Sequence, residues 1–309
     1  MKITPIFHIL SILIMPLSGF MMVSGFVDFV YNNQNWINFF ISATITLFVG
    51  MSVFLATRGH NDQNIDLRQA FVLTTMSWIT IAFFGALPFY LSNINLNFTD
   101  SFFESMSGIT TTGSTILISI EASPPGILVW RSLLQWLGGI GVIVMAIAIF
   151  PMLSVGGMQL FKAENFENPE KVVPRATSLT RGIFIIYSVL TLIWASLLYF
   201  SGMSSFDSIL HSMTTIATGG YSTKSGSIGA FNSQLIDWII ILGMIFGSLP
   251  FVHYLAMTKG SYRDLIKDSQ VRWFLVLLTI LVLTIFSLLF LNGTYDWKDS
   301  IRYSAFNVT

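Results

Sequence analysis

Long apolar runs dominate the chain, and short polar stretches separate them. Each run has about 20 or more residues, the length that an α-helix needs to cross a bilayer. The seven runs are residues 5–30, 36–57, 69–92, 125–152, 182–201, 232–257 and 273–292. Only a helix satisfies its own backbone hydrogen bonds in lipid, so we expect every run to be a transmembrane helix. The pattern predicts an all-α integral membrane protein.

Two of the polar stretches repeat one another. Residues 100–115 read DSFFESMSGITTTGST, and residues 207–223 read DSILHSMTTIATGGYST. Each reaches a glycine thirteen residues after its Asp (113 − 100 and 220 − 207), and a third copy, DSIRYSAFNVT, begins at Asp299. These segments are too short and polar to span a bilayer. Polar Thr/Gly backbone at membrane depth is tolerated only where it lines a water-filled path or is buried in protein.

The residue types in the repeated segment favour a cation pore. The Asp is suited to cap a short pore helix of about two turns, whose negative C-terminal end then points toward the membrane centre. The Thr/Gly stretch follows, and Gly permits backbone angles that other residues resist. Rings of backbone carbonyls can replace the hydration shell of a monovalent cation. The predicted filter residues are Thr110, Thr111, Thr112, Gly113, Ala217, Thr218, Gly219 and Gly220.

The repeats predict tandem units of helix, re-entrant pore loop and helix. The expected organisation is two N-terminal transmembrane helices in 1–68, a first unit in 69–153, a cytoplasmic connection in 154–181, a second unit in 182–257, and a cytoplasmic loop, helix and start of a pore helix of an incomplete third unit in 258–309.

Composition and charge narrow the class further. Hydrophobic residues make up 53% of the chain and charged residues 10%, whereas a soluble domain has roughly 25% charged residues. Fifteen Lys and Arg balance fifteen Asp and Glu, which gives no electrostatic case for nucleic acid. The chain has no Cys, which excludes disulfides and thiol catalysis. We expect neither an enzyme nor a cofactor.

The distribution of cations predicts the orientation. With the N-terminus in the cytoplasm, eleven of the fifteen cations lie on the inner side, as the positive-inside rule requires. They are Lys2, Arg58, Arg68, Lys162, Lys171, Arg175, Arg181, Lys259, Arg263, Lys267 and Arg272.

Several polar residues have two open interpretations. Glu104 and His211 hold equivalent positions in the two pore helices, where each could tune the outer field or play a structural role. Arg131 should pair with Glu104 or Glu121, or contact the back of the filter, because an unpaired charge there is costly. Asp237 should also be paired. The glycines of the apolar runs 125–152 and 232–257 suit close helix packing. They are Gly138, Gly139, Gly141, Gly243 and Gly247.

The motifs SGITTTGST, ATGGYST and WRSLLQWLGGIGVIV (130–144) resemble the Trk/Ktr/HKT superfamily of potassium transporters, above all its bacterial Trk branch. The resemblance covers essentially the whole chain. It implies potassium uptake through a pore that four repeats surround, with one filter glycine in each. Gly113 and Gly220 are the matching positions. Gly at the first position goes with potassium preference, and Ser there goes with sodium in plant relatives.

The resemblance also implies location and partners. These are a bacterial cytoplasmic (inner) membrane, the potassium ion and lipid, a homodimer, and a cytosolic nucleotide-binding regulatory subunit that docks on 154–181 and 258–272. Transport would use the membrane potential, with proton symport as an option.

The family has four repeats, and this chain stops within the third pore helix. We expect a fragment, a truncated reading frame, or a protein that another chain completes. The alternatives are a non-transporting remnant, a sodium-permeable relative, and a membrane enzyme or sensor that uses the repeats as scaffold. The last would need ionisable pairs inside the spans, which carry few beyond Arg131 and Asp237.

Overall fold

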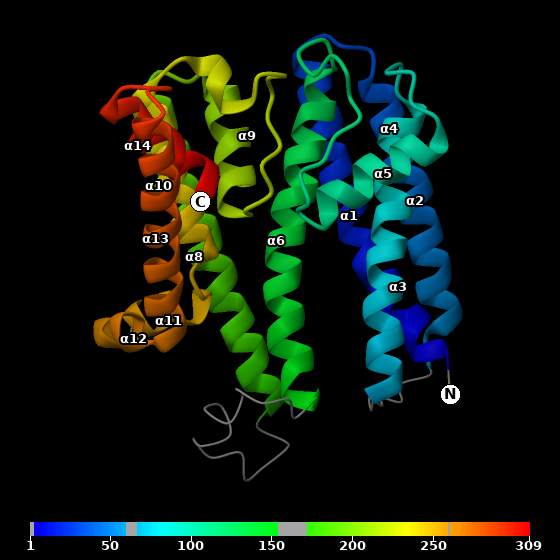
Figure 1. Cartoon of the computed structure of the whole chain (residues 1–309). Coiled ribbons are helices and arrows are strands. Elements are labelled where there is room, and N and C mark those ends of the chain that lie inside the picture. Colours follow the sequence, from blue (N-terminus) through cyan, green and yellow to red (C-terminus); the bar gives the residue numbers. More distant parts are fainter. Residues whose placement is uncertain (1–2, 60–66, 154–171, 259) are drawn as a thin grey trace. The chain divides into compact units, whose positions relative to one another are not determined.

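A computed structural model describes residues 3–59, 67–153, 172–258 and 260–309, and every regular element in these ranges is helical (Figure 1). The longer helices are α1 (Thr4–Val30), α2 (Trp36–Thr57), α3 (Leu67–Gly85), α6 (Pro125–Leu153), α8 (Val172–Phe200), α10 (Gln234–Ser248) and α13 (Ser269–Leu291). The shorter ones are α4 (Leu87–Leu91), α5 (Phe98–Ile109), α9 (Ser205–Ile216), α11 (Phe251–Thr258), α12 (Tyr262–Lys267), α14 (Trp297–Val308) and the 3-10 helix η2 (Ser227–Phe231). Residues 154–171 of the predicted cytoplasmic connection lie outside the described ranges.

The apolar runs form membrane-length helices with one exception. Within the described residues, six helical segments are long and apolar enough to cross a membrane, and α10 with α11 adds a seventh if this bent pair is one span. The two helices meet at 88°, so the prediction of one continuous helix over 232–257 is wrong. Pro250 disfavours helical angles in the residue before it. Leu249 is accordingly extended (φ −75°, ψ 147°), and α10 ends at Ser248.

The three copies of the repeated segment form three matched helices. The helices α5, α9 and α14 each have 12 residues, which exceeds the two turns expected. In each, the side chain three residues before the Asp accepts the hydrogen bond of the Asp backbone N–H, so the prediction that the Asp is the cap is wrong. The Asp lies in the first turn, where its charge still complements the positive helix end. The capping residues are Asn97, Ser204 and Asp296.

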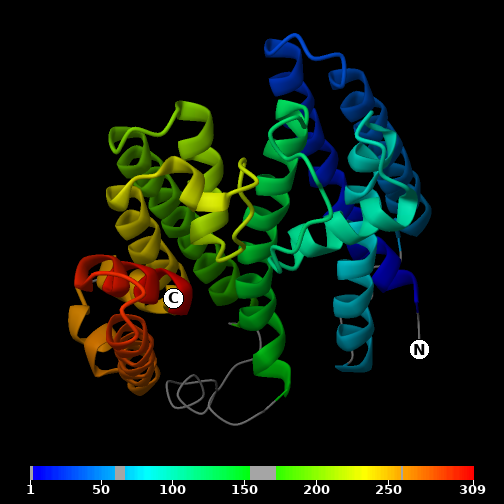
Figure 2. The same cartoon turned by 45° about the horizontal axis from the view of Figure 1, so that its top comes forward.

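The chain divides into two compact units. The first comprises Met1–Val172 with the short segment Gly219–Ser225, and the second comprises Val173–Thr218 with Gly226–Thr309. In the first unit, α1 packs along α2 and also contacts α3 and α6 (Figure 2). The buried carboxylate of Asp28, near the end of α1, accepts a hydrogen bond from the Gly126 backbone N–H (2.6 Å) and thereby caps α6.

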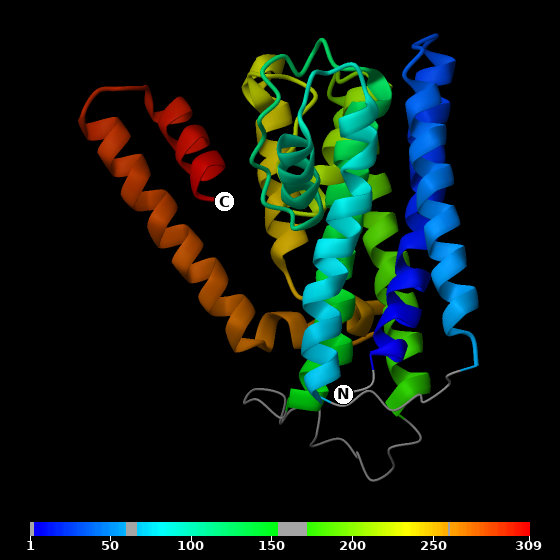
Figure 3. The same ribbon diagram turned by 90° about the vertical axis from the view of Figure 1, so that its right-hand side faces the viewer.

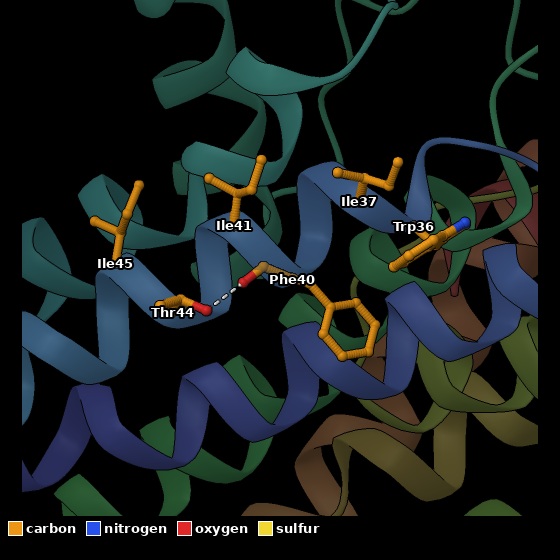
Figure 4. A pocket seen from close by; sticks show the side chains of 6 residues that line it. All are labelled: Trp36, Ile37, Phe40, Ile41, Thr44 and Ile45. Carbon is orange, nitrogen blue, oxygen red and sulfur yellow. Dashed lines mark hydrogen bonds between the residues drawn. The ribbon is translucent and has the colours of Figure 1, made fainter.

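The outer face of α2 is apolar. Ile37, Ile41 and Ile45 line a shallow groove on this helix together with Trp36 and Phe40 (Figure 4). The Thr44 hydroxyl, which also lies there, donates to the Phe40 carbonyl (2.8 Å). The groove therefore presents no unsatisfied polar group from Thr44, which suits contact with lipid tails.

The second unit holds the third copy of the repeated helix. Helix α14 packs beside α13 and against α10 (Figure 3). Its Arg302 pairs with Asp237 of α10 (2.7 Å) and with Asp299 (2.6 Å), so Asp237 is paired, as expected. Leu198, Met203, Ile228, Ile236 and Ile240 form the buried cluster beside these helices.

Glycines let the long helices α6 and α10 approach the short helices α5 and α9. A Cβ on Gly138 of α6 would overlap the carbonyl oxygen of Ile109, the last residue of α5. Gly247 of α10 has the same relation to Ile216, the last residue of α9 (2.8 Å). A Cβ on Gly141 would meet no described atom within 4 Å, so the packing interpretation has no support at that glycine among the described residues.

We expect Gly138→Ala to destabilise the protein by ~2 kcal/mol, because the backbone of α5 must move to admit the methyl group. Gly141→Ala is the matched control, since the same helix has open space at that position. Thermal unfolding of the purified protein in detergent measures the difference. Equal stability of the two variants would contradict this packing.

Candidate functional site

The loops that follow α5 and α9 have the same backbone conformation. Thr111 (φ 55°) and Gly113 (φ 78°) correspond to Thr218 (φ 54°) and Gly220 (φ 79°), each 107 residues later (218 − 111 and 220 − 113). These angles are left-handed, which Gly adopts freely and Thr adopts only at a cost of roughly 1–3 kcal/mol. In Figure 1 the chain turns back sharply at the end of each helix. The repeated sequence is therefore also a repeated, strained backbone.

Local hydrogen bonds hold the first of these loops. The backbone N–H of Thr112 donates to the Ser107 carbonyl (3.0 Å), which closes the end of α5. The Thr110 hydroxyl bonds to the Met106 carbonyl (2.7 Å) and to the Thr112 hydroxyl (2.8 Å). These threonine side chains are thus engaged within the loop, and they stiffen it.

A buried ion pair lies behind the first loop. Arg131 of α6 donates from Nε to the Glu104 carboxylate (2.8 Å), and both side chains are fully buried. Glu104 also accepts from the Thr115 hydroxyl (2.9 Å) and the Ile116 backbone N–H (3.1 Å), so the pair holds the outgoing chain in place.

The same guanidinium reaches the segment Gly219–Ser225. Arg131 donates from Nη1 to the Ser222 carbonyl (3.1 Å) and stacks over the Tyr221 ring (4.1 Å). Of the interpretations left open for Arg131, pairing with Glu104 is confirmed. The contact with Ser222 lies just beyond the predicted filter residues, so contact with the back of the filter stays a prediction.

Glu121, the other expected partner of Arg131, binds Ser225 instead. It accepts from the Ser225 backbone N–H (2.7 Å) and hydroxyl. These hydrogen bonds hold the pKa of the exposed Glu121 carboxyl below its ordinary value. Its charge therefore persists to a more acidic pH than that of a free glutamate, and it fastens the loop before α6 to the segment Gly219–Ser225.

The equivalent residues Glu104 and His211 are both structural. His211 is buried, its Nδ1 is hydrogen-bonded to the Asp207 carbonyl (2.8 Å), and its ring meets Phe231 edge-on. Glu104 is buried in its ion pair. The structural interpretation holds for both positions, although their partners differ completely.

Gln135 is a site residue that the sequence reasoning missed. It is buried, its Nε2 donates to the Gly219 carbonyl (2.8 Å), and its Oε1 accepts from the Tyr221 backbone N–H (3.0 Å). The signal was available: Arg131 and Gln135 are four residues apart, so they share one face of a membrane helix.

The predicted filter residues are placed as follows. Thr110, Thr111, Thr112 and Gly113 belong to the first unit with Gly219 and Gly220, whereas Ala217 and Thr218, which directly follow α9, belong to the second unit. A Cβ on Gly113 would overlap the Gly219 carbonyl oxygen, so the two loop segments adjoin there. A Cβ on Gly220 would meet no described atom within 4 Å, so this glycine borders open space.

The fold and the matched loops define the class: a multi-pass membrane protein with tandem re-entrant helices. The family model TrkH, cation transport protein, matches residues 35–297, and the chain belongs to this family.

Individual proteins of this family are also similar to the chain in sequence and structure. The Trk system potassium uptake protein TrkI of Halomonas elongata is 39% identical over 305 residues, which cover 98% of this chain and 62% of the relative. The Trk system potassium uptake protein TrkH of Escherichia coli K12 is 36% identical, in a match that covers 100% of this chain and 65% of the relative. The crystal structure of the potassium transporter TrkH from Vibrio parahaemolyticus matches all of this chain and 64% of that one, with a TM-score of 0.89 and 31% identity. The chain thus spans less than two thirds of the length of these relatives.

We expect Glu104→Gln to destabilise the protein by about 3–5 kcal/mol, because it leaves the Arg131 guanidinium buried without its counter-charge. The double variant Glu104→Gln with Arg131→Gln should recover much of this loss. Arg58→Gln, at an exposed position, is the control. Thermal unfolding in detergent measures the stability of these variants. A double variant less stable than Glu104→Gln alone would contradict the buried ion pair of Arg131 and Glu104.

Proposed function

We propose that the complete protein takes up potassium across the cytoplasmic (inner) membrane of a bacterium through a filter of backbone carbonyls. The observation that carries the proposal is the matched backbone of the two loops, in which Thr111 and Gly113 repeat as Thr218 and Gly220. Relatives named as potassium uptake proteins support it.

The mechanism rests on the backbone. Carbonyl oxygens of the segments 110–113 and 217–220 replace the water shell of a dehydrated potassium ion, which enters down the membrane potential or by symport with protons. The hydrogen bonds of these loops keep the carbonyls in one arrangement despite the backbone strain at Thr111 and Thr218. The side chains need not be charged for this chemistry.

Orientation and partners are part of the proposal. The N-terminus and the segments 154–181 and 258–272 face the cytoplasm, where a nucleotide-binding regulatory subunit docks, and the protein forms a homodimer. In the described part of this surface, Asp268 caps α13 by accepting from the Gln270 backbone N–H (2.7 Å) and also pairs with His253 (3.1 Å). These bonds give the docking loop a defined shape.

We expect Gly113→Ser to lower discrimination of rubidium or potassium against sodium about tenfold. The added Cβ meets the Gly219 carbonyl oxygen and is strained at φ 78°, so carbonyl spacing must change. Gly202→Ser is the matched control, because Gly202 also has positive φ (105°) but open space around it. Thr309→Ala, at the end of α14, should likewise have little effect.

The measurement uses the complete protein in a potassium-uptake-deficient bacterial strain. Growth on limiting potassium is recorded beside rubidium and sodium fluxes. Wild-type protein that restores neither growth nor flux would refute the proposed function. If Gly113→Ser kept both uptake and ion preference, residue 113 would lie outside the filter.

The orientation is tested by single cysteines, which the chain lacks naturally. A Cys introduced at exposed Tyr262 should resist a membrane-impermeant thiol reagent in intact cells and react after permeabilisation. A Cys at exposed Ile118, in the loop before α6, should react in both conditions. The reverse labelling pattern would invert the proposed topology.

A further inference from the structure

The side-chain amide of Gln135 forms hydrogen bonds with two backbone groups at the start of the segment Gly219–Ser225. Its Nε2 donates to the Gly219 carbonyl and its Oε1 accepts from the Tyr221 N–H, so it bonds on both sides of Gly220. Only one orientation of the amide satisfies both partners, because a flipped amide would set acceptor against acceptor and donor against donor. An amide that is buried and hydrogen-bonded at both ends in this way fixes the backbone it holds.

The two adjacent glycines have different reasons to be glycine. Gly220 has φ 79°, which a side chain would strain. Gly219 instead leaves room for Gln135, since a Cβ there would overlap the Gln135 amide group. Gly219 and Gln135 therefore depend on each other: the glycine leaves the space that the amide occupies, and the amide donates to the glycine carbonyl.

Other contacts hold the same strand from the first unit. The Tyr221 hydroxyl donates to the Glu104 carbonyl (3.0 Å), and the Tyr221 ring lies under Arg131 (4.1 Å). Arg131 and Gln135 project one turn apart from α6, so a single helix face supports the backbone and the ring of Tyr221.

We propose that Gln135 is a positioning residue that sets ion discrimination in the filter. The inference rests on the proposed function. Gln135 holds the Gly219 carbonyl beside Gly113. Its Nε2–H group donates a hydrogen bond to that oxygen and thereby draws electron density from it. Gly219 corresponds to Thr112 in the first repeat (219 − 107), and the inference includes that the Gln135 donor makes the field of the Gly219 carbonyl differ from that of its counterpart. On this inference the filter is electrostatically asymmetric although its backbone angles are repeated.

The decisive variant is Gln135→Glu. A protonated carboxyl both donates and accepts, as the amide does, whereas an ionised carboxylate only accepts and repels the Gly219 oxygen. The introduced carboxyl is protonated at acidic pH and ionised at alkaline pH. Discrimination of rubidium against sodium should therefore be near wild type at acidic pH and fall about tenfold at alkaline pH, the effect of losing one buried hydrogen-bonded pair.

Flux is measured in proteoliposomes of the complete protein with both sides buffered at the same pH. Wild type and Gln34→Glu, at a position between α1 and α2, should show no comparable change in discrimination with pH. A flat pH profile for Gln135→Glu, or one shared with the control, would overturn the inference.

A second readout does not depend on transport. Hydrogen exchange at the Tyr221 amide should be slow in the wild type and at least about tenfold faster in Gln135→Leu, with exchange in α1 and α2 unchanged to show that the variant is folded. Equally slow exchange in both proteins would overturn the inference.

The two readouts separate the possible failures. Wild-type protein without rubidium uptake would refute the proposed function and with it any effect on discrimination, whatever the exchange result. Uptake in the wild type, with fast exchange in Gln135→Leu but unaltered discrimination in Gln135→Glu, would show that the bond exists and does not set selectivity, which overturns the inference alone.

Discussion

The buried pair of Arg131 and Glu104 is the interaction on which the first unit's loops depend. Removing two charges from water is costly, and the geometry offsets this cost only when further hydrogen bonds satisfy both groups. Here the Glu104 carboxylate also accepts hydrogen bonds from Thr115 and Ile116, and Arg131 also donates to Ser222, although its Nη2 has no hydrogen-bond partner among the described residues. The buried charges that make the pair costly thus also order the polar chain that follows α5.

The repeated backbone and its unequal supports follow from this arrangement. The first loop is closed by bonds within its own repeat, such as Thr112 to Ser107. The segment after Gly219 is instead held by α6 through Gln135 and Arg131. Two copies of one strained conformation can therefore rest on different side chains, because what the backbone requires is a partner for each polar group and not a particular residue.

Much of the fold could be predicted from the sequence, since lipid permits few backbone solutions. The apolar runs predicted the long helices, and the equal offset of Gly113 and Gly220 predicted equivalent loops, in which the two glycines have φ of 78° and 79°. The break at Leu249 was missed although Pro250 signals it, because the apolar run continues through it. The role of Gln135 was missed because its partners are backbone groups 84 and 86 residues away. Its spacing from Arg131 places both residues on one helix face but does not identify those partners.

The position four residues after the Asp of each copy shows why local sequence could not settle the rest. It holds Glu104, His211 and Tyr303 in the three copies. Glu104 meets an arginine from α6, whereas His211 bonds back to its own helix at Asp207. The ring of Tyr303 lies beside Arg302, whose charge goes to Asp237 of α10. The helix and its cap are fixed by short-range chemistry, but the partner at this position differs with the surroundings of each copy: another helix for Glu104 and the same helix for His211. The interactions at this position are consequently a property of the packing of each copy and not of the repeated motif.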